Sequence, residues 1–416
     1  MTYTARQLLA YGLFGLPLAL VALPVYVMVP QLYAINLGMP LATVGAVLLA
    51  ARVLDAFIDP LLGRWIDRAP HGRGHAGFVL LALPPLLAGF VALFHPPGLS
   101  GNALIGWFGA SLVMVYLGYS IATIAHNSWG ASLTQRRGER ARLTAVREGC
   151  ALAGVVLAAI LPTLGGLTAL SVAFAVLLLA TAGLLWQRAP RAVLAVEQTA
   201  ALADADTHWL APLAGRRFRW LFAVFAMNGI AAAIPATLFL FFASDRLQLP
   251  QHASTFLLLY FGAAALTLPL WSRIAARIGE ARAWLGAMLL GVVAFAWTAA
   301  LGAGDMLPFA LVCVATGATL GADLALPPAL LAGVIGDAGH AGGREGSYFG
   351  LWSWMTKMNL ALAAGIALPL LEWLDYVPGA AEPAGLVALT VAYALLPCVL
   401  KAGAALLLWK APLRDV

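Results

Sequence analysis

Residues 50–74 read AARVLDAFIDPLLGRWIDRAPHGRG and join an apolar segment to a basic loop. The apolar part carries three charged residues, Arg52, Asp55 and Asp59. Residues spaced three and four apart share one face of a helix, so these side chains point the same way. Charges at membrane depth are costly and usually mark an ion or substrate path. This segment is therefore the first candidate for a functional site.

The composition places that stretch in a membrane. Of the 416 residues, 62% are hydrophobic and 10% are charged, whereas a soluble domain has about 45–50% apolar and about 25% charged residues. A spanning helix needs about 20 apolar residues, and a barrel strand only about 9–11. Windows of helical length predict an all-α polytopic protein with twelve spans: 8–29, 41–60, 77–94, 104–125, 144–161, 170–186, 220–242, 255–271, 284–301, 307–335, 348–371 and 386–409.

The charge pattern gives an orientation. Most of the 24 Lys and Arg residues fall in loops on one side of the twelve-span arrangement. The positive-inside rule then places both termini in the cytoplasm, and we expect a bacterial inner membrane. The net charge of +6 accordingly indicates contact with anionic lipid and no nucleic-acid partner.

Two halves share a short pattern. PLLGRWIDR (60–68) ends the second span, and PLWSRIAAR (269–277) ends the eighth. We predict an N-terminal six-helix bundle (1–187), a cytoplasmic linker (188–217) and a C-terminal six-helix bundle (218–416), an arrangement that resembles the major facilitator superfamily. Ala264 and Leu268 replace Asp55 and Asp59 in the second half, so a carboxylate pair serves the first half only.

The aspartates could bind a cation or share a proton, since two carboxylates one turn apart do either. The alternative is a structural cluster neutralised by Arg52. Ser120 or Thr123 could add oxygens, because the fourth span carries a polar stripe; Ser and Thr also commonly satisfy their own helix backbone. The members of the stripe are Tyr116, Ser120, Thr123 and Asn127.

Arg147 and Glu148 begin the fifth span. Neighbours point about 100° apart on a helix, so the two need not pair with each other. Arg147 is expected to bridge to the aspartates, face a cavity or form a structural ion pair, and Glu148 to act as a gate or a loop salt bridge.

In the second half, Asp323 precedes Pro327-Pro328, which we expect to interrupt the tenth span and expose it to a cavity. The alternative is a structural pair with Lys357 in the eleventh span, which follows Trp352. Lys401 is a weaker candidate nearer an interface, and Asn228 is interpreted as a helix-packing residue.

Other chemistry finds no support. The seven His are scattered, and there is no HExxH, phosphate loop or nucleophile elbow. Three separated cysteines, Cys150, Cys313 and Cys398, give no metal or disulfide pattern. We therefore expect no enzyme, no cofactor and no resident metal, unless sodium binds at Asp55 and Asp59, and we expect a monomer.

Four stretches resemble the glycoside–pentoside–hexuronide:cation symporters, the melibiose-permease-like branch of the major facilitator superfamily. They are YGLFGLP (11–17), ARVLDAFIDPLLGRWIDR (51–68), SWGASLTQRRGERARLTAVRE (128–148) and GDAGHAGGREGSYFGLWSWMTK (336–357). The resemblance implies that Asp55 and Asp59 bind the coupling cation and that Ser120 adds an oxygen. It also implies that Arg147 and Lys357 are basic residues near the cavity.

The chain departs from that family at the sugar site. Ala19 and Thr123 stand where sugar-transporting members have acidic residues, and Asn127 replaces an aromatic. A galactoside substrate is therefore not expected. Ile58 replaces a polar residue of sodium-using members, which favours a proton, since sodium needs several oxygen ligands.

The first hypothesis is therefore a secondary transporter, with a cation coupled to a small organic solute by alternating access. Substrate contacts are expected from Thr123, Asn127, Arg147, Asp323, Trp352 and Lys357, and a gating charge network from Arg52, Arg64, Asp67 and Glu148. A lipid or lysolipid flippase on the same fold is one alternative, and a non-transporting sensor or assembly factor is another.

Overall fold

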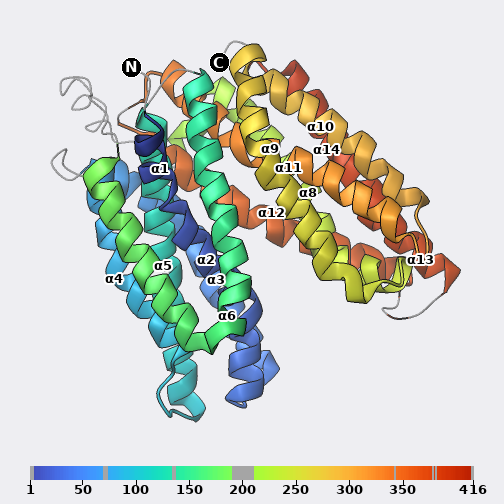
Figure 1. Cartoon of the computed structure of the whole chain (residues 1–416), viewed down its shortest axis with the longest axis horizontal. Helices are drawn as coiled ribbons and strands as arrows, with labels where there is room; N and C mark the ends of the chain where they lie inside the picture. Colours follow the sequence, from blue (N-terminus) through green and yellow to red (C-terminus); the bar gives the residue numbers. More distant parts are fainter. Residues whose placement is uncertain are drawn as a thin grey trace. The chain divides into compact units, whose positions relative to one another are not determined.

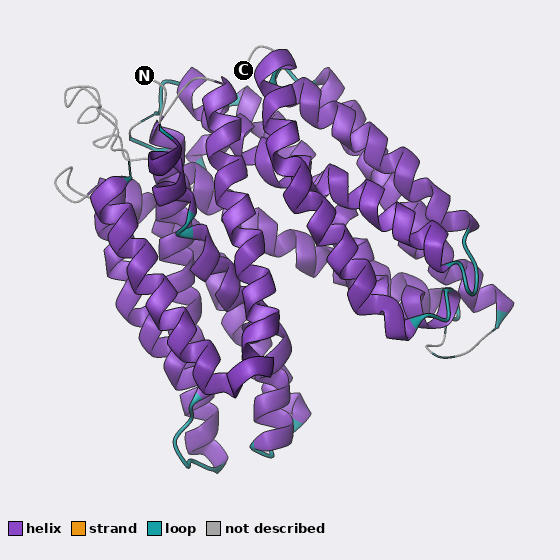
Figure 2. Cartoon of the chain, viewed as in Figure 1, coloured by secondary structure: helices purple, strands orange, loops and turns teal. Residues whose placement is uncertain are grey.

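The computed structural model describes residues 4–68, 74–133, 137–189, 210–341, 343–376, 379 and 382–413. Helices joined by short loops make up these described residues, without a strand among them (Figure 2). The first helices along the chain are α1 (Ala5–Gly12), α2 (Gly15–Gln31), η1 (Leu32–Asn36), α3 (Leu41–Arg68), α4 (Gly74–Phe94), α5 (Gly101–Leu133) and α6 (Arg137–Arg188).

The later helices follow residue 210. They are η2 (Ala211–Ala214), α8 (Arg216–Phe241), η3 (Phe242–Arg246), η4 (Pro250–His252), α9 (Ala253–Ile278), α10 (Glu280–Ala296), η5 (Trp297–Ala300), α11 (Met306–Asp337), α12 (Glu345–Trp373), α13 (Pro383–Thr390), η6 (Val391–Leu395) and α14 (Leu396–Lys410) (Figure 1).

Eleven helical segments of the described chain are long and apolar enough to cross a membrane. They correspond to eleven of the twelve predicted spans. The remaining predicted span lies in α3, a 28-residue helix whose charges lower its hydropathy. The predicted all-helical class is confirmed.

Three details differ from the prediction. The first span is divided between α1 and α2, because Pro17 cannot donate the backbone hydrogen bond that would join them. The fifth and sixth spans follow each other without a loop, and non-helical backbone at Gly165 and Gly166 divides α6 into these two spans. The interruption expected at Pro327-Pro328 is wrong, since α11 continues through both prolines to Asp337.

The chain divides into two compact units. Unit 1 contains residues 1–135, 146–210 and 338–354, and unit 2 contains residues 136–145, 211–337 and 355–416. The predicted linker, 188–217, lies mostly outside the described residues, and the predicted boundaries of the two halves stay predictions.

In unit 1, α5 packs along α4 and also contacts α3. Glycines allow the close approach of α4 and α5, since a Cβ at Gly118 would lie 2.7 Å from the Cβ of Leu86 and one at Gly89 would lie 2.8 Å from the amide nitrogen of Val115. Small residues at helix crossings are typical of membrane proteins. This packing fixes α3 and α5 as neighbours.

In unit 2, α9 packs along α11, and α8 packs along α14. An aromatic core lies between them: the ring centres of Phe242 and Tyr393 are 4.1 Å apart, and those of Phe256 and Phe309 are 4.8 Å apart. Tyr393 belongs to η6, a π-helical turn that joins α13 to α14. Such turns insert an extra residue into a helix and are frequent at functional sites.

Candidate functional site

Asp55 and Asp59 lie on the buried face of α3, as their spacing predicted. Their exposed fractions are 7% and 0%, whereas Leu54 and Phe57 on the other face are 46% and 68% exposed. Helical periodicity therefore directs the carboxylates into unit 1 and the apolar side chains outward.

Each aspartate is held by a serine. The hydroxyl of Ser120 in α5 donates a hydrogen bond to Oδ1 of Asp55 at 2.8 Å, and the hydroxyl of Ser353 in α12 donates to Oδ2 of Asp59 at 2.6 Å. Hydrogen bonds to a carboxylate are short and comparatively strong. The structure thus joins Ser120 to Asp55 and adds Ser353, which was not among the predicted site residues.

Arg52 contributes to the same face. Its guanidinium carbon lies 5.9 Å from the ring centre of Tyr116, over the face of that ring. Tyr116 and Ser120 therefore both turn toward α3, so this part of the polar stripe on α5 faces the charged part of α3.

A proton and a metal ion place different demands on this site. A proton needs one carboxylate, whereas a hard cation such as sodium takes several oxygens. Asp55 and Asp59 have serines from different helices, and the described residues contain no group of three or more His, Cys, Asp and Glu that could hold a metal. Which ion binds stays a prediction.

The backbones of α3 and α12 touch beside Asp59. A Cβ at Gly350 would lie 2.7 Å from the carbonyl oxygen of Asp59, and a Cβ at Gly63 or Gly346 would collide with the carbonyl oxygen of the other glycine. Gly346 and Gly350 are four apart, the small-xxx-small spacing that permits close helix crossings. This crossing brings Ser353 within reach of Asp59.

Asp67 caps the start of α12. Its Oδ1 accepts the backbone N–H of Gly346 at 2.7 Å, and its Oδ2 accepts the N–H and the hydroxyl of Ser347 at 2.7 and 2.6 Å. A carboxylate at a helix N-terminus satisfies free amides and interacts favourably with the helix dipole. Nε of Arg64 is buried and has no hydrogen-bond partner among the described residues.

Arg147 and Glu148 pair with each other, so the interpretation that they need not do so is incomplete. Nε of Arg147 donates to Oε1 of Glu148 at 3.0 Å, and a terminal nitrogen bonds the same oxygen. The other terminal nitrogen bonds Oδ1 of Asn127. The guanidinium presents donors in a wide fork, so it reaches an adjacent residue despite the helical angle. Arg147 thus forms the structural pair rather than a bridge to the aspartates.

Thr123, Trp352 and Lys357 are the remaining predicted substrate contacts. Thr123 is half-buried, and its hydroxyl has no hydrogen-bond partner among the described residues. Trp352 is buried, with 6% exposed, near the start of α12, and Lys357 lies half-buried further along that helix. Their roles in substrate binding stay predictions.

Asp323 lies at the centre of a network in unit 2. Its Oδ1 accepts hydrogen bonds from Nε1 of Trp284 at 2.7 Å and Nδ2 of Asn228 at 3.1 Å, and its Oδ2 lies 2.6 Å from Nζ of Lys401. Lys401 also donates to Oδ1 of Asn228 at 2.9 Å. The suggested pair with Lys357 is therefore wrong, because α14 presents Lys401 to the carboxylate instead.

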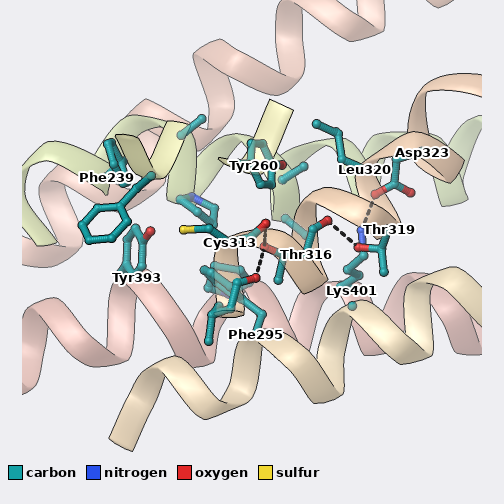
Figure 3. A pocket seen from close by; sticks show the side chains of 18 of the residues that line it. Phe239, Tyr260, Phe295, Cys313, Thr316, Thr319, Leu320, Asp323, Tyr393 and Lys401 are labelled. Carbon is teal, nitrogen blue, oxygen red and sulfur yellow. Dashed lines mark hydrogen bonds and ion pairs between the residues drawn. The ribbon is translucent and has the colours of Figure 1, made fainter. Parts of the chain in front are cut away.

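A cavity of about 440 Å³ lies beside this network, within unit 2. Figure 3 shows Phe239 and Tyr393 at one end of it and Asp323 and Lys401 at the other. Most of its lining is aliphatic or aromatic, from α8, α9, α10, α11, η6 and α14.

The sequence pattern of the family described as MFS/sugar transport protein matches residues 8–415. The chain belongs to this family. This match confirms the predicted family and the predicted major facilitator fold. The protein is an integral membrane transporter rather than an enzyme.

Two curated relatives of this MFS/sugar transport protein are symporters by name. The uncharacterized symporter YjmB of Bacillus subtilis (strain 168) is 28% identical over 115 residues, which are 27% of this chain and 25% of that protein. The inner membrane symporter YicJ of Escherichia coli (strain K12) is 30% identical over 125 residues, 30% of this chain and 27% of that protein. The matched stretches thus span about a quarter of each relative.

Solved structures agree on the fold. A bacterial homologue of the iron transporter ferroportin, in an outward-facing state, has a TM-score of 0.70 at 17% identity, covering 96% of this chain and 98% of that one. The fucose:proton symporter FucP of E. coli has a TM-score of 0.64 at 14% identity, with 96% and 98% covered. At these identities the likeness shows the fold alone.

Sequence reasoning did not predict the partners of three residues in this transporter's polar networks: Ser353, Trp284 and Lys401. A signal existed for Lys401, because an ammonium and a carboxylate inside spans each require a neutralising partner. No pattern singled out the indole of Trp284, whose contact depends on how α10 packs against α11.

Proposed function

We propose that this transporter is a symporter that couples a cation, a proton in preference to sodium, to a small organic solute by alternating access. The observation that carries the proposal is the complete burial of Asp59, with the Ser353 hydroxyl at 2.6 Å. A buried carboxylate is stable when paired, hydrogen-bonded or protonated, so binding a proton changes the energy of this site strongly. The symporter names of the curated relatives support the same conclusion.

Neutralisation is proposed as the condition for reorientation. Moving one charge through 100 mV is worth about 2.3 kcal/mol, whereas desolvating a bare ion costs several kcal/mol. A proton on the pair formed by Asp55 and Asp59 removes that cost. Asp323 and Lys357 are proposed to contact the solute from the second half. The protein is proposed to act as a monomer without cofactor in a bacterial inner membrane, with both termini cytoplasmic.

A flippase for lipid or lysolipid is the second candidate. The observation that favours it is the largely apolar lining of the cavity in unit 2. Scrambling of a fluorescent lysolipid in proteoliposomes, independent of any ion gradient, would support this candidate over symport.

The test is gradient-driven uptake into proteoliposomes. A thermal-shift screen of sugars, amino acids and lysolipids first identifies a solute, whose uptake is then followed under an imposed pH or sodium gradient. Wild type is compared with Asp59→Asn and with Asp375→Asn, a control in a loop at a positive φ of 56° that Asn also tolerates. We expect loss of pH-driven uptake in Asp59→Asn only; gradient-driven uptake that survives this change would overturn the coupling role.

A further inference from the structure

The cavity in unit 2 has an apolar body and one polar end. The aromatic residues that line it are Phe239, Phe256, Tyr260, Phe261, Phe295, Phe309 and Tyr393. Lining positions on α8 run from Ala231 to Leu240, a distance of about 14 Å at the helical rise per residue. Cavities of this size and character accommodate small organic molecules.

The opening of the cavity is apolar as well. The exposed residues in its lining all come from α8 and α9: Ala232, Ala236, Leu240, Leu257 and Phe261. These two helices pack on α14 and α11 respectively rather than along each other. A molecule that enters between them passes only hydrocarbon side chains, so a sugar with many hydroxyls would lose its hydration without replacement.

Lys401 keeps one hydrogen-bond donor at the polar end of the cavity. Nζ of Lys401 carries three N–H groups and donates to Asp323 and Asn228; no described residue accepts the third. Thr316 and Thr319 donate hydrogen bonds from their hydroxyls to backbone carbonyls, so their oxygens can still accept a hydrogen bond from a ligand.

The charge at this end is balanced. Lys401 and Asp323 neutralise each other. A ligand carboxylate would lie beside Asp323, and a ligand ammonium beside Lys401, so either would meet a like charge in a medium of low dielectric constant. An uncharged group such as a hydroxyl or carbonyl meets neither penalty and accepts the remaining N–H.

We propose that this cavity binds an uncharged amphipathic molecule, with a chain or ring system along the aromatic walls and one hydroxyl or carbonyl at Lys401. Binding stands on the cavity alone; that the molecule is also the transported solute rests on the proposed function. A lysolipid that inserts its tail would place a methyl group against the charged pair, whereas this class places its polar head there.

Two native cysteines allow a direct test, because Cys313 and Cys398 line the cavity and Cys150 does not. The protein in nanodiscs is alkylated with N-ethylmaleimide in the presence of 1-decanol, decane, decanoate, decyltrimethylammonium or decanoyl lysophosphatidylcholine, each over the same range of membrane content. Mass spectrometry follows each cysteine. We expect 1-decanol to protect Cys313 and Cys398 but not Cys150, at about ten-fold lower content than decane, the factor for one hydrogen bond to a charged group.

Two variants and a matched control examine the site itself. Ala236→Trp fills the opening and should abolish protection, while Ala223→Trp, on the same helix and outside the lining, should retain it. In the charge-balanced double variant Asp323→Asn with Lys401→Met, decane and 1-decanol should protect Cys313 and Cys398 equally. Equal protection by decane in wild type, stronger protection by the charged chains or the lysolipid, or equal protection of Cys150 would each overturn the proposal.

The outcomes separate the two proposals. Absence of protection with gradient-driven uptake intact removes the cavity site and leaves symport standing. Protection without gradient-driven uptake of any solute confirms the binding site and removes symport.

Discussion

Nζ of Lys401 lies 2.6 Å from Oδ2 of Asp323, joining residues 78 positions apart in the sequence. Asn228 contacts both, receiving a hydrogen bond from Lys401 and donating one to Asp323. Three helices of unit 2 therefore meet at one neutral network. Neither charge could remain at this depth alone without a large desolvation cost.

Removing only one residue of the pair formed by Lys401 and Asp323 should destabilise the protein more than removing both. We expect Lys401→Met to destabilise the protein by about 3 kcal/mol, because it leaves a buried carboxylate unpaired. The double variant with Asp323→Asn should recover most of that loss. Thermal unfolding in detergent measures both, with Lys410→Met, an exposed lysine on the same helix, as the control. Additive losses in the double variant would show that the two residues do not interact.

The hydroxyl of Ser353 should influence the pH dependence of uptake. Donation to Asp59 favours the ionised carboxylate, so Ser353→Ala should shift the pH of half-maximal uptake upward by about one unit, the equivalent of about 1.4 kcal/mol. If sodium were coupled instead, the same change would raise the sodium concentration required and leave the pH profile in place. Ser272→Ala, which removes a hydroxyl bonded to the Pro269 carbonyl, is the control.

The crossing of α3 and α12 should not tolerate a methyl group. Gly350→Ala brings a Cβ to 2.7 Å from the Asp59 carbonyl oxygen, a backbone atom that cannot rotate away. We expect a loss of about 1–3 kcal/mol. Gly365→Ala on the same helix has open space around it and should be neutral or stabilising by up to about 1 kcal/mol. Unfolding midpoints that fall equally would contradict this account.

The Asp67 cap should be visible in amide exchange. Asp67→Ala removes the acceptors for the Gly346 and Ser347 amides and should cost about 1 kcal/mol locally, or roughly a five-fold faster exchange of those two amides. Hydrogen–deuterium exchange with mass spectrometry gives the rates. Ser347→Ala keeps the hydrogen bonds from both backbone amides to Asp67 and should leave those amides protected from exchange. Unchanged exchange in Asp67→Ala would argue against a cap.

The sequence predicted what periodicity and hydropathy control. Spacing placed Asp55 and Asp59 on one face, and the polar stripe on α5 supplied Ser120 at the correct level. Window length predicted the spans, because an apolar segment of about 20 residues has few other stable states in a membrane.

The partners across helices were harder to predict. Lys357 was the predicted alternative partner of Asp323 and Lys401 was a weaker candidate, but the packing of α14 presents Lys401 to the carboxylate. Arg147 bonds its neighbour Glu148 although adjacent residues point about 100° apart on a helix. The hydrogen bond from Ser353 to Asp59 depends on a glycine crossing between segments nearly 300 residues apart. Helical periodicity describes neighbours within one helix and does not show which distant segments of the chain pack together.

The π-turn η6 sets the rotational phase of α14. Five residues, Val391–Leu395, form this wide turn just before the helix that carries Lys401. Each residue of an α-helix advances the side-chain direction by about 100°. Deleting a single residue from η6 would therefore rotate every side chain beyond it by that angle and turn the ammonium away from its carboxylate. The extra residue in this π-turn therefore sets the direction in which every side chain of α14 points, including that of Lys401.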